Sequence, residues 1–125
     1  MRFFKSYIVL LAALLALPGA AHAGGNAAQG KSYFSRCAIC HSNAKGAPNS
    51  IGPNLFGIVG RHAAAMPNFF YSGAMKRSNI TWTPQKLEAY ITRPQGVVPG
   101  NRMAFAGVSS HQQVEDLVAY LMTLK

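Results

Sequence analysis

The chain has 125 residues, half of them hydrophobic, and carries 12 Lys and Arg against only 3 Asp and Glu. This length allows one small domain beside a targeting segment and excludes a second domain. The basic surplus suits an acidic protein, an anionic membrane or nucleic acid as partner, but the basic residues are scattered, with no run longer than Lys76-Arg77, which disfavours nucleic acid.

The first 23 residues have the layout of a secretory signal peptide. Arg2 and Lys5 precede an apolar run over 7–17, and Pro18-Gly19 leads to Ala21-His22-Ala23, an A-x-A cleavage pattern. Because the apolar run is far shorter than the roughly 20 residues that span a bilayer, we expect cleavage after Ala23 and no stable membrane insertion. The mature domain is then 24–125, with ten basic and three acidic residues and a net charge of +7.

A helix is predicted to begin near Ala27, because Asn26 and Gln29 form a capping-box pattern. It runs into the sequence CAICH at 37–41, which holds both cysteines of the chain.

The CAICH spacing favours a c-type haem attachment over other uses of two thiols. A disulfide between Cys37 and Cys40 would close a very small loop and stabilise little. No strand-like alternation supports a thioredoxin frame, and His62 and His111 lack the paired spacing of a zinc site. Two thiols at this spacing can add to the two vinyl groups of one porphyrin, and His41 can bind the iron from the same face.

Three further helices follow in the chain. A short one is predicted around 70–76. Another has Thr83 as N-cap and Pro84 at its first position, and it stops before Pro94. The last is capped by Ser109 or Ser110 and is expected to reach the C-terminus. The predicted fold is all-α, with three to five helices and long loops.

Met103 is the best candidate for the second axial position of the iron. It lies in VVPGNRMAFAG, where Pro99-Gly100 and Gly107 break any helix and small apolar residues can line a haem edge. Thioether sulfur opposite histidine suits an electron-transfer haem. The other methionines and histidines of the expected mature chain fit helix packing or surface positions better: Met66, Met75, Met122, His62 and His111.

Five blocks of this chain, in order, resemble the class I cytochromes c, especially the bacterial c2-like members close to the mitochondrial protein. The blocks are GKSYFSRCAICH, IGPNLFGIVGR, NITWTPQKLEAYITRP, VVPGNRMAFAG and EDLVAYL. The resemblance implies the small cytochrome c fold and one haem c per chain, covalently attached through Cys37 and Cys40 and ligated by His41 and Met103. It also implies that the first and last helices cross near Gly30 and Phe34 against Leu117 and Tyr120.

By matching position, the family implies a set of supporting residues. The carbonyl of Pro53 is expected to accept the second ring N–H of His41. Arg61, Tyr71 and Trp82 match the partners of a haem propionate. Tyr90 matches the hydroxyl neighbour of the methionine sulfur, and Asn101 stands near the same network. The expected apolar walls of the haem site are Leu55, Phe69, Tyr90, Val98 and Phe105.

Some positions depart from the family pattern. Met75 stands where asparagine is common, and Ala64 stands where glycine is common. Gln95-Gly96 replaces a lysine pair beside the methionine loop, so only a thinner docking surface is expected, from Lys31, Lys45, Lys86 and Arg102.

The resemblance implies a soluble, monomeric one-electron carrier between respiratory or photosynthetic redox partners, exported to the bacterial periplasm. Its partners would be membrane or periplasmic redox proteins with acidic docking surfaces, not nucleic acid. The alternative is a small haem enzyme or gas-binding module, which would need an open iron and a polar group beside it.

Overall fold

A computed structural model describes residues 24–125. They form α1 (Ala27–Tyr33), the 3-10 helix η1 (Phe34–Arg36), α2 (Gly73–Arg77), α3 (Pro84–Thr92), α4 (Pro94–Val97) and α5 (His111–Leu121). Across this described range there is no strand beyond an isolated bridge between His62 and Thr81. The all-α prediction is therefore confirmed. The predicted signal peptide lies outside the described residues and stays a prediction.

Polar caps fix where most of these helices begin. In each case a side-chain oxygen of the N-cap accepts the backbone N–H three residues later, which satisfies a donor that the helix leaves free. The caps are Asn26, Ser72, Thr83 and Ser110, at 3.1, 3.0, 3.2 and 3.3 Å from their donors. The caps predicted at Asn26 and Thr83 are thus present, and of the two serines considered Ser110 is the cap.

Two predicted helix boundaries are wrong, and one short helix was not predicted. α2 begins at Gly73 instead of near Phe70, because Ser72 caps it. α5 ends at Leu121 instead of at the terminus, and the chain turns so that the Leu124 carbonyl accepts the Gly57 N–H at 2.7 Å. Pro94 ends α3 as expected, but it also starts α4. Proline suits the first position of a helix, where its missing N–H is not needed.

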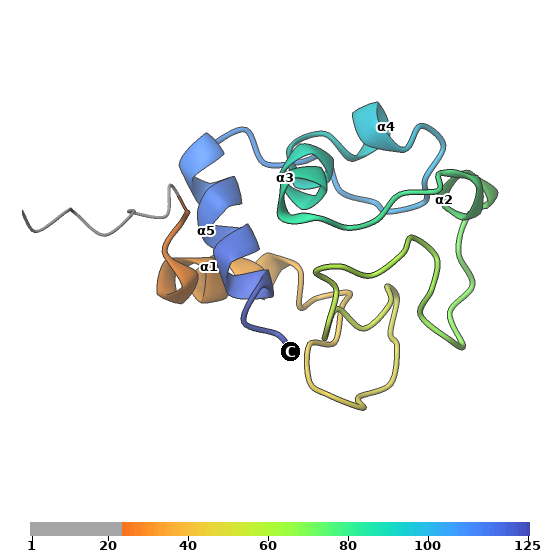
Figure 1. Cartoon of the computed structure of the whole chain (residues 1–125), viewed down its shortest axis with the longest axis horizontal. Helices are drawn as coiled ribbons and strands as arrows, with labels where there is room; N and C mark the ends of the chain where they lie inside the picture. Colours follow the sequence, from red (N-terminus) through yellow and green to blue (C-terminus); the bar gives the residue numbers. More distant parts are fainter. Residues whose placement is uncertain (1–23) are drawn as a thin grey trace, which may run out of the picture.

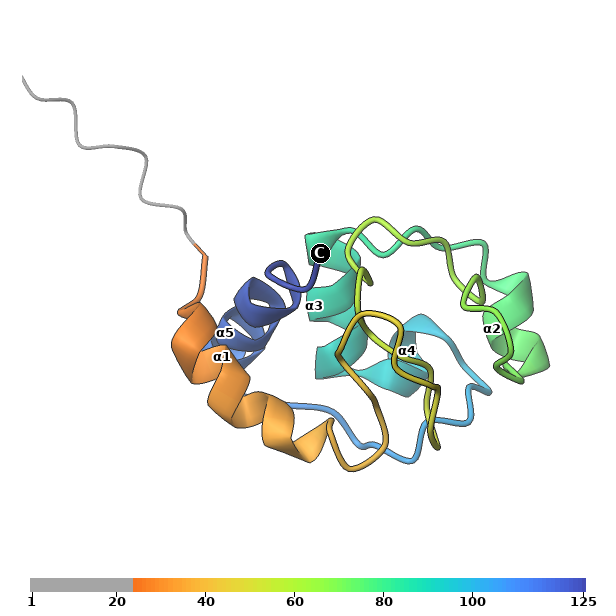
Figure 2. The ribbon, with the colours of Figure 1, turned by 90° about the horizontal axis from the view of Figure 1, so that it is seen from below.

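α1 and α5 cross at one end of the molecule, with α2 at the other end in both views (Figures 1 and 2). A Cβ atom on Gly30 would lie 1.8 Å from the Asp116 carbonyl oxygen and 2.9 Å from Cβ of Tyr120. Phe34 and Tyr120 pack with ring centroids 5.3 Å apart. The predicted crossing is present, and its closest backbone approach is to Asp116.

Asp116 also ties the two helices together through its side chain. The carboxylate is only 4% exposed, and its Oδ1 accepts the Asn26 N–H at 2.7 Å and the Gln112 amide at 2.9 Å. A negative group at the start of α1 is favourable, because the first amides of a helix carry partial positive charge. The crossing therefore combines close packing with a buried polar contact.

Candidate functional site

A cavity of about 770 Å³ lies between the crossed helices, α3 and the long loops. All ten predicted site residues line it: Cys37, Cys40, His41, Pro53, Arg61, Tyr71, Trp82, Tyr90, Asn101 and Met103. They come from the end of η1, the loops before and after α2, α3 and the loop after α4. The fold thus gathers residues that are up to 66 positions apart, counting from Cys37 to Met103.

The cysteines occupy a single turn that continues from η1. The backbone N–H groups of Cys40 and His41 both donate to the Cys37 carbonyl, at 3.0 and 2.9 Å. Positions three and four apart on such a turn face the same side. No disulfide joins Cys37 and Cys40. Burial raises the pKa of the Cys37 thiol, and the neighbouring Arg36 opposes this.

His41 is held in one orientation by the segment that follows it. Its Nδ1–H donates to the Pro53 carbonyl at 2.7 Å, which leaves Nε2 with its lone pair. A Cβ atom on Gly52 would lie only 2.4 Å from Cε1 of His41, so glycine is what leaves room for the ring. Burial lowers the pKa of His41, partly offset by the hydrogen bond to Pro53, and this favours the neutral, ligating form.

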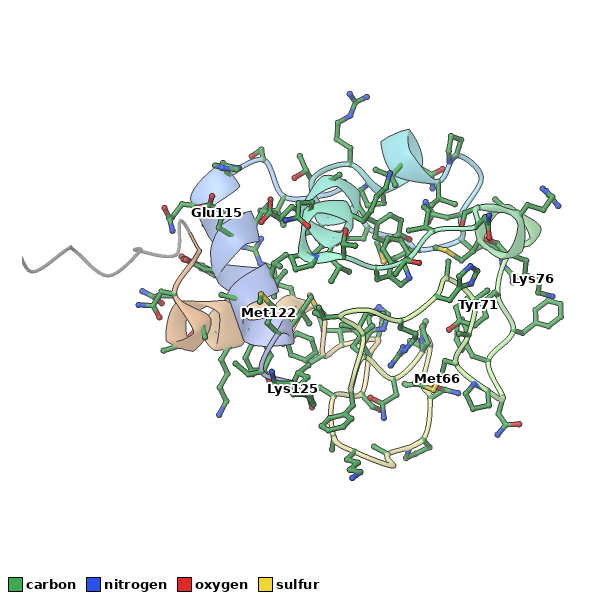
Figure 3. All side chains as sticks on the ribbon, viewed as in Figure 1. Met66, Tyr71, Lys76, Glu115, Met122 and Lys125 are labelled. Atoms are coloured by element: carbon green, nitrogen blue, oxygen red, sulfur yellow. The ribbon has the colours of Figure 1, made fainter. Side chains whose placement is uncertain are left out.

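The lining of the cavity distinguishes among the candidates for the second axial ligand of the iron. Met103 lines it, whereas Met66, Met122, His62 and His111 do not. Figure 3 shows Met122 at the α1–α5 end of the molecule and Met66 on the loop before α2. Met75, however, is buried and also lines the cavity. Met75 is therefore the one alternative that the structure keeps within reach, and sequence reasoning had placed it in ordinary helix packing.

Two amide side chains hold the loop that carries Met103. Oδ1 of Asn101 accepts the Met103 N–H at 2.9 Å, and its Nδ2 donates to the Val98 carbonyl. Gln95 braces the same loop from α4, because it accepts the Gly100 N–H and donates to the Asn101 carbonyl, both at 2.9 Å. Sequence reasoning missed this role of Gln95. The only available signal was an amide side chain just after a helix-starting proline.

Arg61 and Trp82 are joined through their backbones, since the Trp82 N–H donates to the Arg61 carbonyl at 2.8 Å. The Arg61 guanidinium donates to the carbonyls of Asn54, at 2.9 Å, and Phe56. Its pKa is lowered by burial. These bonds fix a cation beside the cavity wall.

The hydroxyls of Tyr71 and Tyr90 and the indole N–H of Trp82 differ in their hydrogen-bond partners. The Tyr71 hydroxyl accepts the Met66 N–H at 3.2 Å. The Trp82 and Tyr90 rings pack at 4.9 Å, and no hydrogen bond within residues 24–125 uses the indole N–H or the Tyr90 hydroxyl, although neither is a buried orphan. Both groups therefore open onto the cavity. Burial raises the pKa of Tyr90 to about 12 and also raises that of Tyr71.

The lining has the character that a haem requires. It is mostly apolar, and it includes Arg36, Arg61 and Arg102 but no carboxylate. Such a cavity can take a flat apolar ring and balance its acidic substituents. Leu55, Phe69, Tyr90 and Phe105 form walls as expected. Val98 does not line the cavity, because it is buried in the core behind the loop.

The position of Ala64 explains the glycine that is common there. Its φ is 60°, in the left-handed region that disfavours a Cβ atom. Alanine is thus strained where glycine would not be.

Comparisons with known proteins agree with this geometry. The sequence model of the cytochrome c family matches residues 27–125. Similar relatives include cytochrome c2 of Agrobacterium tumefaciens (strain II Chrys), 43% identical over 78% of this chain and 91% of the relative, and cytochrome c2 of Blastochloris viridis, 44% identical over 86% and 85%.

The structure of cytochrome cH from Methylobacterium extorquens superposes with a TM-score of 0.74 at 38% identity, over 79% of this chain and 99% of that one. None of the helices within residues 24–125 has both the length and the apolar character to cross a membrane. The chain belongs to the cytochrome c family, as a c2-like electron carrier with one covalently attached haem c.

Proposed function

We propose that Cys37 and Cys40 form the two thioether bonds of the haem and that His41 and Met103 are the axial ligands of its iron. The observation that carries this proposal is the shared cavity, which places the CAICH turn and the Met103 loop around one space. A bound haem supplies one-electron exchange between Fe(II) and Fe(III).

The protein's contribution is to hold both ligands still. Pro53 and Gly52 fix the His41 ring, and Asn101 and Gln95 fix the backbone at Met103. Ligands held in this way keep the same arrangement in both oxidation states, so little of the structure must move when an electron arrives or leaves. The Met/His pair favours the reduced state and raises the potential.

The other walls of the cavity carry a cation and hydrogen-bond donors that suit the propionates of a haem. Arg61 is fixed by carbonyl bonds, and the Trp82 indole opens onto the cavity. Together with Tyr71 they form the propionate-binding side of the proposal. Tyr90, neutral because of its raised pKa, is assigned beside the Met103 sulfur as a hydroxyl donor.

The same lining argues against an enzyme. An acid–base mechanism needs a positioned side chain that gains and loses a proton near neutral pH. Among the described residues that line the cavity, the only histidine is His41 and there is no Asp or Glu. Electron transfer without substrate chemistry is therefore the function that the site supports best, with a peroxidase-like or gas-binding activity as the alternative.

We further propose that the chain is exported to the bacterial periplasm after cleavage at Ala23 and acts there as a monomer. Its partners are redox proteins of the membrane or periplasm with acidic surfaces. Residues 24–125 carry ten Lys and Arg against three Asp and Glu, a surplus that attracts acidic surfaces over a distance. Bacterial cytochromes named c2 are among its relatives.

Acid–acetone extraction tests the attachment. Protein made in a host that matures c-type cytochromes should keep its colour in the protein fraction and have the mass of the chain plus one haem. Cys37→Ala and Cys40→Ala should each leave a single bond and lower the yield of coloured protein, whereas Ser35→Ala, an exposed change two residues before Cys37, should not. Colour that moves into the solvent would exclude covalent attachment at these thiols.

A further inference from the structure

Phe70 is a large apolar side chain presented to solvent, with 76% of its surface exposed. Two cations hold it in place: Nζ of Lys76 lies 4.9 Å from the ring centroid and Cζ of Arg102 lies 5.1 Å from it. Nη2 of Arg102 also donates to the Phe70 carbonyl at 2.9 Å. Because the ring is already ordered, a partner that binds it pays little for fixing it.

A shallow cavity of about 450 Å³ adjoins this ring, between α2 and the loop before Met103. Three cations line it, Lys76, Arg77 and Arg102, and no carboxylate does. The one close contact between a basic and an acidic side chain found within residues 24–125 joins His111 to Glu115 on α5, and Figure 3 shows Glu115 at the opposite end of the molecule from Lys76. The positive charge of this surface is therefore not neutralised by the protein itself.

The surface lies directly against the proposed haem site. Phe70, Tyr71, Ser72 and Arg102 line both the shallow cavity and the large one. A protein bound here would contact residues that also line the proposed haem site. None of Lys31, Lys45 and Lys86, which the sequence suggested for docking, lines either cavity.

We propose that Phe70, Lys76, Arg77 and Arg102 form a docking surface, the Phe70 patch, for an acidic redox protein. The partner places carboxylates against the three cations and receives the phenyl ring in an apolar recess. Aromatic side chains and arginine are enriched in protein–protein interfaces, where a polar rim surrounds an apolar centre. The inference rests on the proposed electron-carrier function, and it names the surface that this function uses.

The test measures electron exchange with proteins of the source organism. Reduced holoprotein is mixed with a cell extract that contains membranes and soluble proteins, and its oxidation is followed at the haem absorbance. Phe70→Ala should lower the rate about tenfold, and Lys76→Gln/Arg77→Gln should lower it about fivefold at low salt. The effect of the charge change should fade near 1 M salt, where the Debye length is about 3 Å, whereas the Phe70→Ala effect should persist.

Matched variants control for charge and hydrophobicity. Lys31→Gln/Lys45→Gln removes the same charge away from the patch, and Met122→Ala removes an apolar side chain that is 46% exposed and lines neither cavity. Both should stay within about twofold of the unmodified protein, since neither change removes a side chain of the patch, and two charges are a small part of the surplus that steers encounter. All variants are first checked by absorption spectrum and thermal unfolding, and the charge pair keeps the test decisive if Phe70→Ala does not fold.

The outcomes separate this inference from the function on which it rests. Equal losses in patch and control variants would overturn the patch and leave the electron carrier standing. Binding to phosphatidylglycerol vesicles that depends on Phe70, with electron exchange unaffected, would make the surface a lipid contact and also overturn the proposal. No electron exchange with any fraction of the extract would instead contradict the proposed function.

Discussion

Gln95 holds the Met103 loop from outside the cavity, and this makes one exposed side chain important for ligation. Its amide bonds the loop at both Gly100 and Asn101. Each such hydrogen bond stabilises by about 1 kcal/mol in net terms. Loss of both hydrogen bonds should make the Met103 sulfur easier to displace from the iron, although Gln95 itself lies outside the cavity.

Gln95→Ala should therefore raise the affinity of the oxidised protein for imidazole, which competes for the iron, by about tenfold. Gln95→Glu keeps the acceptor for the Gly100 N–H and loses the donor to the Asn101 carbonyl. Its imidazole affinity should therefore lie between those of the unmodified protein and Gln95→Ala. Gln85→Ala removes the same side chain from the exposed face of α3 and should change nothing. Imidazole titration followed by absorbance gives the affinities. Identical affinities in Gln95→Ala and Gln85→Ala would show that the loop holds Met103 without this brace.

The residues that line the cavity could be predicted where residue type and spacing, or the family resemblance, mark them. Those of CAICH and the isolated Met103 were found from type and spacing, and Pro53, Arg61 and Trp82 from the resemblance. Their roles toward the haem stay predictions. Gln95 and Met75 could not be found in this way, because their places depend on which backbone lies next to them after folding. Nothing in the sequence distinguishes an amide that braces a loop from one in solvent.

At the scale of helices, capping patterns were the reliable signal and helix ends were not. Asn26, Thr83 and Ser110 start helices as predicted. The end of α5 is set by a tertiary hydrogen bond between residues 124 and 57, which no local pattern contains. α4 was missed because Pro94 was interpreted only as a terminator.

The crossing of α1 and α5 gives a prediction with a clear sign. Gly30→Ala raises the helix propensity of α1 by about 1 kcal/mol, so an isolated helix would become more stable. In the folded protein the added methyl would meet the Asp116 carbonyl, and overpacking costs about 1–3 kcal/mol, with the upper end expected against backbone. We therefore expect a net loss of about 2 kcal/mol in the free energy of unfolding of the holoprotein.

Denaturant unfolding measures this difference, with Ser32→Ala as the control. Ser32 is exposed on the same helix, and its replacement by alanine should leave stability unchanged or slightly raised. If Gly30→Ala were as stable as Ser32→Ala, the two helices could separate without cost, and the close crossing would not be needed for stability.

The cavity is the structural feature around which the elements of the molecule are arranged. Residues from η1, the long loops, α2, α3 and α5 line it. Most elements of residues 24–125 therefore have one side against the cavity. A domain of this size has a small core, and the cofactor completes it. The same arrangement separates the molecule into a helical end at α1 and α5 and a basic end at α2 and the loop before Met103.

If the cavity holds a haem with His41 and Met103 on its iron, the far-red absorption of the oxidised protein should report it. A weak band there reports a bond between methionine sulfur and ferric iron. Met75→Leu preserves side-chain volume in the other methionine that lines the cavity and serves as the matched control. The band should be present in the unmodified protein, survive in Met75→Leu and disappear in Met103→Ala, which should then bind carbon monoxide when reduced. A band that survives in Met103→Ala, or one that is lost in Met75→Leu, would contradict this assignment of the axial ligands.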